Sequence, residues 1–423
     1  RYFSGDISKK NFILSNASFS LPALLPWFCL SIIADALGFL PWQPLKKILQ
    51  TPAGEIGYIA LFLIAVTVFG PVLIKRIWNC KPLEQGLPRT MIENACKKAD
   101  LKYSNILKWE LFGGTMITAG VMGLVGRFRY ILVTPALINS LNDDELISVI
   151  LHEIGHVKKH HMLFYLFFFA GFILCNFIFF EPLMLFLYIV EPVYQLFGLA
   201  GVEKTTAHSI LISLSLVGIF VLYFRFVFGF FMRNFERQAD LHVYNFTKDA
   251  SPLISTFYKI ASFSRQSIDT PNWHHYSIGQ RVRFLERCQA TPALIQAHHL
   301  HVRKLVAGYF ILLVLLFGIG YSINYGIAKE PFDNFVAEKI LFQQIDVDPE
   351  NSELYALVGD YYYNRKNYGK AIDSYENVLM ADPENVHALN NLSWLFSTCP
   401  KEEYRNGKKA LEYAQRALVQ KRE

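Results

Sequence analysis

The feature that most constrains this fold is a set of four long apolar runs. Each run is close to the ~20 residues that a helix needs to cross the hydrocarbon core of a bilayer. Hydrophobic residues make up 52% of the 423 residues and charged residues only 18%, a balance typical of polytopic membrane proteins. The predicted spans are 56–74, 162–180, 209–232 and 305–327. We therefore expect a lipid bilayer as partner.

Two other apolar stretches are interrupted. The run 21–40 contains Pro22, Pro26 and Asp35, and is a fifth candidate span. The stretch 182–201 is broken by Pro182 and Pro192, each preceded by Glu. Because a proline removes a helical hydrogen bond, we expect this second stretch to be interfacial or re-entrant rather than spanning.

Charge and cysteine usage argue against a nucleic-acid-binding protein and against a protein held together by disulfides or structural zinc. The net charge is +6, and basic residues are not interleaved with aromatic ones on a polar surface, so nucleic acid is not an expected partner. The six cysteines are scattered without a C-x-x-C pair, which predicts neither a disulfide framework nor a structural zinc site. Because the chain starts at Arg1 and stops inside a repeat pattern, we expect both ends to be trimmed.

A five-residue string, His152-Glu153-Ile154-Gly155-His156, carries the strongest chemical signal. On a helix, positions four apart differ by about 40° around the axis, so the two imidazoles face the same way. The run from Asn142 to Glu145 precedes it as a helix start, with acids at the positive helix end. The string predicts one catalytic Zn²⁺ bound by His152 and His156, with Glu153 as general base toward a water molecule.

A third ligand is expected from the segment after the span 209–232. Glu236 and Asp240 share a helix face, so one could bind zinc while the other orients a ligand imidazole. The alternative is a solvated helix face at the membrane boundary. If this segment completes the site begun at His152, both segments must lie on the same side of the membrane. The chain between them then crosses the membrane an even number of times. The spans 162–180 and 209–232 then form an inserted hairpin.

Basic residues predict the orientation. The site-bearing loops 78–161 and 233–304 hold 10 and 10 Lys and Arg, whereas loops 41–54 and 191–208 hold 2 and 1. By the positive-inside rule, the site is predicted to face the cytoplasm. Residues 328–423 hold 12 basic and 16 acidic residues, in agreement with the opposite side. We expect an integral membrane location, in a bacterial inner membrane.

The chain after residue 350 shows a repeat. The small and large positions of a 34-residue tetratricopeptide unit are matched by Tyr355, Gly359, Tyr362, Ala371, Tyr375 and Pro383. A second copy starts near Asn385 if five residues are inserted around 400–406. The alternative is an ordinary amphipathic helical hairpin. Tetratricopeptide repeats would bind a protein partner, and more than two are usually needed for a stable stack.

Together these residues resemble a known family. The HEIGH string, the hydrophobic hairpin and the string ERQAD at 236–240 are similar to the family-48 metallopeptidases, which include CAAX prenyl proteases and HtpX-type proteases. The likeness covers about residues 80–290. It includes 129–134, similar to the strand before the catalytic helix. The resemblance implies that Glu236 is the third zinc ligand and that Asp240 supports the site.

Two further segments resemble elements of that family. Residues 118–123 resemble its N-A-x-x-x-G element, which implies that Thr118, Ala119 and Gly120 bind substrate; Thr118 replaces the usual Asn. Downstream, the resemblance implies that His275 stabilises the tetrahedral oxyanion and that Arg281 organises the cleft. Tyr276 departs from the usual Pro. The alternative for this segment is a polar surface turn.

We do not expect the other histidines to be catalytic. His160 and His161 follow Lys158 and Lys159 and are expected at the membrane interface. Three more histidines lie just before the last span and could bind metal adventitiously: His298, His299 and His301.

The predicted fold is a mainly α polytopic membrane protein. Residues 1–77 form an N-terminal transmembrane region, and 78–304 form a zincin-type domain with a small β-sheet and the inserted hairpin at about 162–232. A transmembrane helix follows at 305–327 and an α-helical repeat module at 350–423. The predicted function is zinc endoproteolysis of a protein or peptide in membrane-protein quality control or processing. The alternatives are a signalling protease triggered through its repeats and an inactive scaffold.

Overall fold

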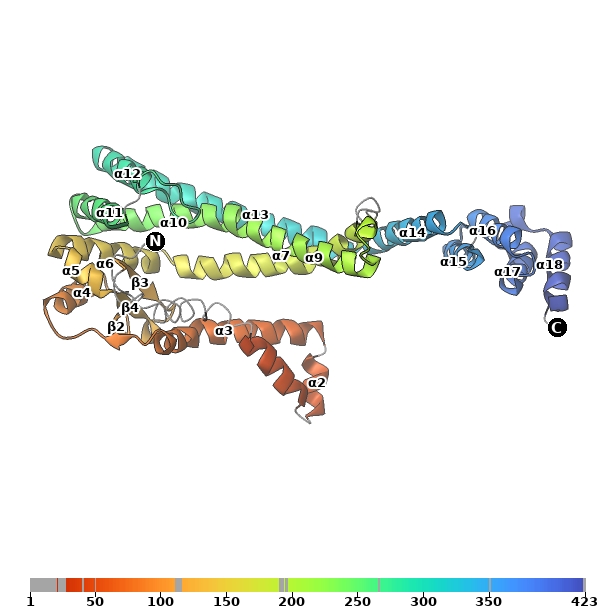
Figure 1. The fold of residues 1–423 in the computed structure, drawn as a ribbon, viewed down its shortest axis with the longest axis horizontal. Coiled ribbons are helices and arrows are strands. Elements are labelled where there is room, and N and C mark those ends of the chain that lie inside the picture. Colours follow the sequence, from red (N-terminus) through yellow and green to blue (C-terminus); the bar gives the residue numbers. More distant parts are fainter. Residues whose placement is uncertain are drawn as a thin grey trace. The chain divides into compact units, whose positions relative to one another are not determined.

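A computed structural model shows a mainly helical chain with one small four-stranded sheet, which confirms the predicted fold class (Figure 1). The structure describes residues 21, 28–39, 42–49, 51–110, 116–189, 194, 197–264, 267–349 and 351–420. Two compact units emerge, one of 1–172 with 219–311 and the other of 173–218 with 312–423.

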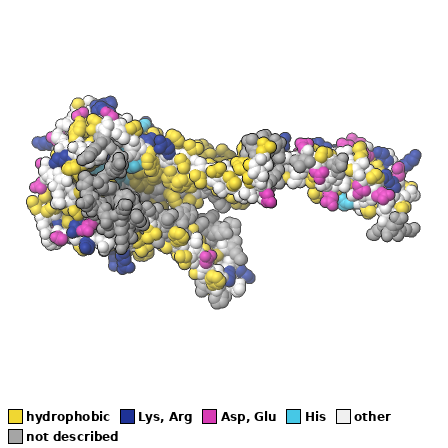
Figure 2. Space-filling view, viewed as in Figure 1, with side chains coloured by type: hydrophobic (Ala, Val, Ile, Leu, Met, Phe, Trp, Pro, Cys, Tyr) yellow, Lys and Arg dark blue, Asp and Glu magenta, His cyan; other side chains and the backbone are white. Residues whose placement is uncertain are grey.

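Within the described residues, four helices are long and apolar enough to cross a membrane, in agreement with the four predicted spans. The stretches are Ala60–Ile77, His161–Phe180, Thr205–Asn245 and Ala293–Asn324. They indicate an integral membrane protein. Figure 2 shows hydrophobic side chains along the long helices, and charged side chains among the C-terminal ones. Of the fifth candidate, the described part forms only a shorter apolar helix, Phe28–Phe39.

The expected break at Pro182 is wrong. Helix α7 runs over His161–Ile189 with Pro182 inside it. Such a proline is tolerated where neighbouring helices and local adjustments satisfy the freed backbone carbonyl, as is common in apolar membrane helices. Residues 190–193 and 195–196 of the predicted interfacial stretch lie outside the described residues.

One apolar helix continues into the segment that contains Glu236. Helix α9, Lys204–Leu222, is followed by a π-helical turn η3, Tyr223–Phe228, and then by α10, Gly229–His242. A π-turn shifts the helical register without breaking the helix, and such turns are frequent at functional sites. Here the shift lies between the apolar span and the polar residues of α10.

The sheet has the order β1-β2-β4-β3, which leaves β3 at an edge. Its strands are β1 (Lys81–Pro82), β2 (Asn105–Lys108), β3 (Ala119–Met122) and β4 (Tyr130–Val133). Strands β2 and β4 are parallel, whereas β3 pairs with β4 antiparallel, with Ala119 opposite Val133. Strand β4 lies within the expected 129–134 segment and is fully buried.

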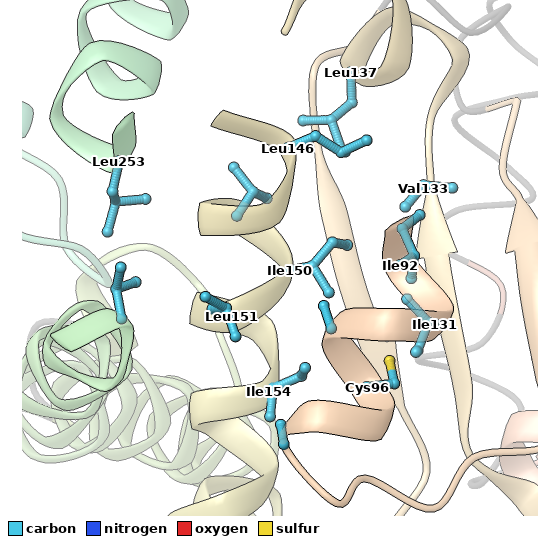
Figure 3. Packing of buried hydrophobic residues seen from close by; sticks show 14 of the residues in the cluster. Ile92, Cys96, Ile131, Val133, Leu137, Leu146, Ile150, Leu151, Ile154 and Leu253 are labelled. Carbon is cyan, nitrogen blue, oxygen red and sulfur yellow. The ribbon is translucent and has the colours of Figure 1, made fainter. Parts of the chain in front are cut away.

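The sheet and two helices enclose the main core of this unit. Helices α4 (Leu87–Lys98) and α6 (Asp143–Lys158) pack on the sheet through Ile92, Ile150 and Ile154, all almost fully buried (Figure 3). The remaining helices of this unit are α2 (Gln43–Leu49), α3 (Pro52–Ile77), α5 (Pro135–Ser140), α11 (Ser251–Ser264), α12 (Ile278–Ala290) and part of α13 (Ala293–Asn324), with short turns η2 (Gly126–Phe128) and η4 (Val243–Asn245). The core therefore fixes one face of α6 and leaves the opposite face for chemistry.

The C-terminal helices pack in sequence order, each against the next. They are α14 (Lys329–Val347), α15 (Ser352–Asn364), α16 (Tyr368–Ala381), α17 (Val386–Thr398) and α18 (Gly407–Gln420). A Cβ atom at Gly359 would lie 2.5 Å from the Tyr375 ring, so a glycine is needed where α15 meets α16. The short helix η5, Glu402–Tyr404, falls within the predicted insertion.

Candidate metal centre and substrate cleft

Helix α6 begins at a capping box. The Asn142 side chain accepts a hydrogen bond from the Glu145 amide, and the Glu145 carboxylate accepts one from the Asn142 amide, each at 2.9 Å. The same carboxylate accepts hydrogen bonds from Lys259 (2.6 Å) and Ser255 (2.7 Å) of α11. These contacts satisfy the free amides at the helix start and join α6 to α11.

Gly155 lets α6 and α10 approach closely. A Cβ atom at this position would lie 2.8 Å from the Cβ atom of His242, which is too short for a real contact, and 3.0 Å from the Cα atom of Ala239, which is very tight. Ala239 is itself fully buried. Two small residues therefore bring the α10 carboxylates within reach of the α6 imidazoles. This role of Gly155 is not evident from the sequence, although the residue stands inside the HEIGH string.

Three donor groups converge between these helices. The Nε2 atoms of His152 and His156 are 3.3 Å apart, and they lie 3.6 Å and 3.4 Å from the two Glu236 carboxylate oxygens. A tetrahedral zinc site with bonds of about 2.0–2.1 Å has ligand atoms about 3.3 Å apart. The spacing and the N,N,O donor set therefore fit a zinc ion. All three groups are buried or half-buried.

Asp240 lies behind this donor set. Its Oδ1 atom is 2.9 Å from His152 Nδ1, the ring nitrogen that faces away from the other donors. Arg281 donates two hydrogen bonds to the same carboxylate, at 2.9 Å and 2.5 Å, and packs on the Phe257 ring. Asp240 and Arg281 thus neutralise each other in a buried setting. The Arg281 guanidinium also lies 3.5 Å from a Glu236 carboxylate oxygen, so it offsets charge on both carboxylates of α10.

The two imidazoles have different surroundings. Burial lowers the pKa of His156 to about 4, so this ring is neutral at pH 7 and has a free nitrogen lone pair. Burial also opposes a charge on His152, but the neighbouring Asp240 carboxylate raises its pKa. Only a neutral imidazole can bind a metal, so binding at His152 would release any proton held there.

Glu153 lies in the cleft beside the donor set. Burial raises the pKa of its carboxyl group to about 7, and a hydrogen bond with the Val121 backbone opposes this shift. A carboxyl group with a pKa near 7 can both take and release a proton at neutral pH. The position and the pKa suit the proton-transfer role expected for this residue.

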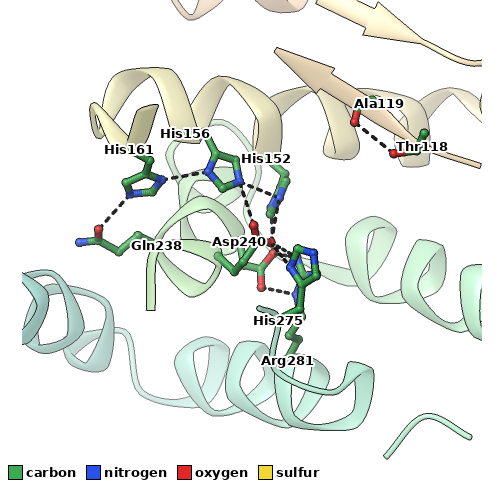
Figure 4. A network of polar contacts seen from close by, with 10 residues as sticks. Thr118, Ala119, His152, His156, His161, Gln238, Asp240, His275 and Arg281 are labelled. Carbon is green, nitrogen blue, oxygen red and sulfur yellow. Dashed lines mark hydrogen bonds and ion pairs between the residues drawn. The ribbon is translucent and has the colours of Figure 1, made fainter. Parts of the chain in front are cut away.

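The cleft has a volume of about 590 Å³ and is bordered by the edge strand β3. Thr118, Ala119 and Gly120 line it on one side, and His275 and Arg281 line it on another. The Thr118 hydroxyl donates to the Ala119 carbonyl at 3.2 Å, so it is engaged with the strand itself (Figure 4). Every candidate site residue except Asp240 contributes to this one cleft.

The loop before α12 contains His275. Its Nδ1 atom is 3.1 Å from a Glu236 carboxylate oxygen, and its side chain is partly exposed. Ser277 then caps α12 and starts a second capping box with Gln280. The Arg237 guanidinium stacks on Tyr276, the residue that replaces the family's Pro, with 3.6 Å to the ring centroid. The structure therefore places this segment at the site rather than in a remote surface turn.

His161 is the first residue of the candidate span His161–Phe180, and its expected place at the membrane interface stays a prediction. This residue is fully buried, and its Nδ1 atom is 3.0 Å from Nδ1 of His156. The reason is a left-handed residue at His160, with φ 59°, which ends α6 and turns the chain back before α7 begins. A helical periodicity continued past Lys159 could not show this turn.

The family comparison agrees with the geometry of the site. The sequence profile of peptidase family M48 matches residues 82–307, more than half of the chain. A search of the solved structures finds Ste24p from S. mikatae, with 17% sequence identity and a TM-score of 0.44; the match covers 66% of this chain and 66% of that one, slightly less than two thirds of either. The comparison with curated proteins finds no match. This chain belongs to peptidase family M48.

Proposed function

We propose that this chain is an integral-membrane zinc endopeptidase. The observation that carries the proposal is the convergence of His152, His156 and Glu236 at tetrahedral spacing, with Glu153 alongside in a cleft bordered by an edge strand. A protein or peptide is the substrate class, in agreement with the family. Membrane-protein quality control or processing is the proposed role.

The residues present fit a zinc ion, and each has a distinct task. His152, His156 and Glu236 would hold the ion, and Asp240 would orient the His152 ring from behind. When bound, the ion would act as a Lewis acid that lowers the pKa of a water molecule toward 7. Arg281 contacts both Asp240 and Glu236, so it offsets part of the carboxylate charge that would surround the ion.

Glu153 would move the proton. Its carboxylate accepts a proton from the attacking water and later gives it to the amine of the leaving peptide, so the carboxylate is restored after each cycle. A nearby positive ion would favour the charged form and lower its pKa from about 7. His275 would donate a hydrogen bond to the tetrahedral oxyanion, and Arg281 would keep the cleft in shape.

Strand β3 would bind the substrate main chain. Within the described residues β3 pairs only with β4, so its other side can add a further strand from an extended peptide. The segment Thr118 to Gly120 lies along this border of the cleft. Backbone pairing gives affinity without a fixed sequence, which suits a protease that acts on unfolded segments.

We also propose an orientation of the site in the membrane and a role for the C-terminal helices. The basic residues near the span ends favour a cytoplasmic site, with the C-terminal helices on the opposite side. We propose that these helices are tetratricopeptide repeats that bind a protein partner. The contact of Gly359 with the Tyr375 ring supports this, since such repeats need a small residue where paired helices meet.

The test is cleavage of unfolded casein by detergent-purified protein, wild type against Glu153→Gln, with bound zinc measured in both. We expect activity in the wild type alone, at equal zinc content. Equal activity in both would contradict the role of Glu153. Zinc bound without activity in either would instead favour the second candidate, a signalling protease that is triggered through the repeats. In that case removal of 350–423 should change cleavage, whereas a general protease should be unaffected.

A further inference from the structure

We propose that His161 and Gln238 are positioning residues that fix the His156 ring in the form able to bind a metal. The inference rests on the metal site of the proposed function. Four side chains form one continuous line of hydrogen-bond contacts. His156 Nδ1 lies 3.0 Å from His161 Nδ1, and His161 Nε2 lies 3.1 Å from Gln238 Oε1. Gln238 Nε2 lies 3.2 Å from His299 Nδ1 of α13.

The direction of each hydrogen bond follows from Gln238. Its Oε1 atom can only accept, so His161 donates through Nε2–H. A neutral imidazole carries one N–H, so His161 Nδ1 must accept, and His156 donates to it through Nδ1–H. His156 Nε2 is then left with its lone pair, directed at the other two donors. The opposite direction would place a hydrogen on Nε2 and block the metal.

Packing holds the middle of this line in place. The His161 ring stacks on Phe235 of α10, with 4.4 Å between centroids and 6° between planes. His161 is fully buried and Gln238 nearly so, which excludes water as a competing partner. Phe235, Glu236 and Gln238 thus come from one turn of α10. One helix supplies a metal donor and also orients the ring of another.

The two ligand histidines are therefore oriented by different chemistry. His152 Nδ1 faces the charged Asp240–Arg281 pair, whereas His156 Nδ1 faces a neutral imidazole backed by an amide. A metal-binding histidine usually gives its second N–H to a carboxylate, a carbonyl or water, and loss of that partner costs about 10–100-fold in metal affinity. His161 takes this place for His156.

The test is zinc affinity of the detergent-purified full chain, measured by competition with a chelator. His161→Phe keeps the ring and its stacking on Phe235 but removes both nitrogens, so we expect affinity to fall about 10–100-fold. Gln238→Met removes the acceptor and should weaken zinc binding. Gln238→Glu keeps an acceptor oxygen and should retain wild-type affinity. The visible spectrum of the cobalt-substituted protein should change in the first two variants only.

His160→Asn is the matched control. This neighbouring histidine is exposed, and asparagine tolerates its left-handed backbone, so zinc affinity should not change. Wild-type affinity in His161→Phe would overturn the inference. Equal loss in Gln238→Glu and Gln238→Met would do the same, since packing alone would then explain the effect. A wild type that binds no zinc would overturn the metal site itself.

Discussion

Two close helix contacts in this molecule depend on a glycine, yet they join very different surroundings. At Gly155 a missing Cβ allows α6 to meet α10, and at Gly359 a missing Cβ allows α15 to meet the ring of Tyr375 on α16. In the first region five buried polar side chains lie on or beside the two helices: His152, His161, Glu236, Gln238 and Asp240. In the second the nearby buried side chains are mostly apolar: Val358, Ala371, Ile372 and Val378.

The difference shows what each contact is for. Apolar burial stabilises a fold directly, by about 25 cal/mol per Å². A buried ion pair such as Asp240–Arg281 gives little net stability, because desolvation offsets the attraction. The α6–α10 contact therefore serves geometry at the site, whereas the α15–α16 contact serves cohesion.

The largest effect is expected from Glu153→Gln, which alters the chemistry and leaves both glycine contacts intact. Loss of a positioned acid–base group lowers the rate by about 10²–10⁴-fold. Casein cleavage should fall by this factor, while zinc content and thermal stability stay at the wild-type level. A variant that loses zinc along with activity would mean that Glu153 belongs to the donor set.

Removal of Arg281 should cost the most stability. Arg281→Met leaves the Asp240 charge buried without its partner, and breaking a buried pair in this way costs about 3–5 kcal/mol. The measurement is denaturant unfolding in detergent. Arg283→Met is the control, because its ion pair with Asp269 is exposed on both sides and should contribute less than about 1 kcal/mol. Similar losses in the two variants would contradict the contrast.

The two glycines can be compared directly by Gly155→Val and Gly359→Val. Overpacking at either contact should cost about 1–3 kcal/mol. Only Gly155→Val should reduce bound zinc, because only that contact sets donor distances. Zinc content and limited proteolysis of the C-terminal helices would be measured in both. Zinc loss in Gly359→Val would show that the two regions are coupled, against our interpretation.

A smaller effect concerns the start of α6. Burial would raise the pKa of Glu145, but hydrogen bonds from Lys259, Ser255 and the Asn142 backbone lower it below its ordinary value of 4.5. A lowered folded-state pKa gives stability that is present above about pH 4.5 and is lost as pH falls through the folded-state pKa. Lys259→Met should flatten this acid dependence by less than about 1 kcal/mol. An unchanged pH profile of unfolding would exclude this contribution.

The sequence predicted those features that depend on local signals. The four spans follow from uninterrupted apolar runs, and α6 follows from a helix start at Asn142 with periodic burial after it. The features that the sequence did not reveal depend on contacts between distant residues or on unusual backbone conformations. Pro182 does not break α7, and the left-handed turn at His160 sends His161 into the core. The role of Gly155 depends on a contact with a helix more than 80 residues away, which no local pattern reveals.

The most direct test of the central claim is the zinc content of the purified full chain, wild type against Glu236→Gln and Glu153→Gln. We expect one zinc ion per chain in the wild type and in Glu153→Gln, and clear loss in Glu236→Gln, because Glu236, unlike Glu153, belongs to the donor set. Stoichiometric zinc in Glu236→Gln, or none in the wild type, would contradict it.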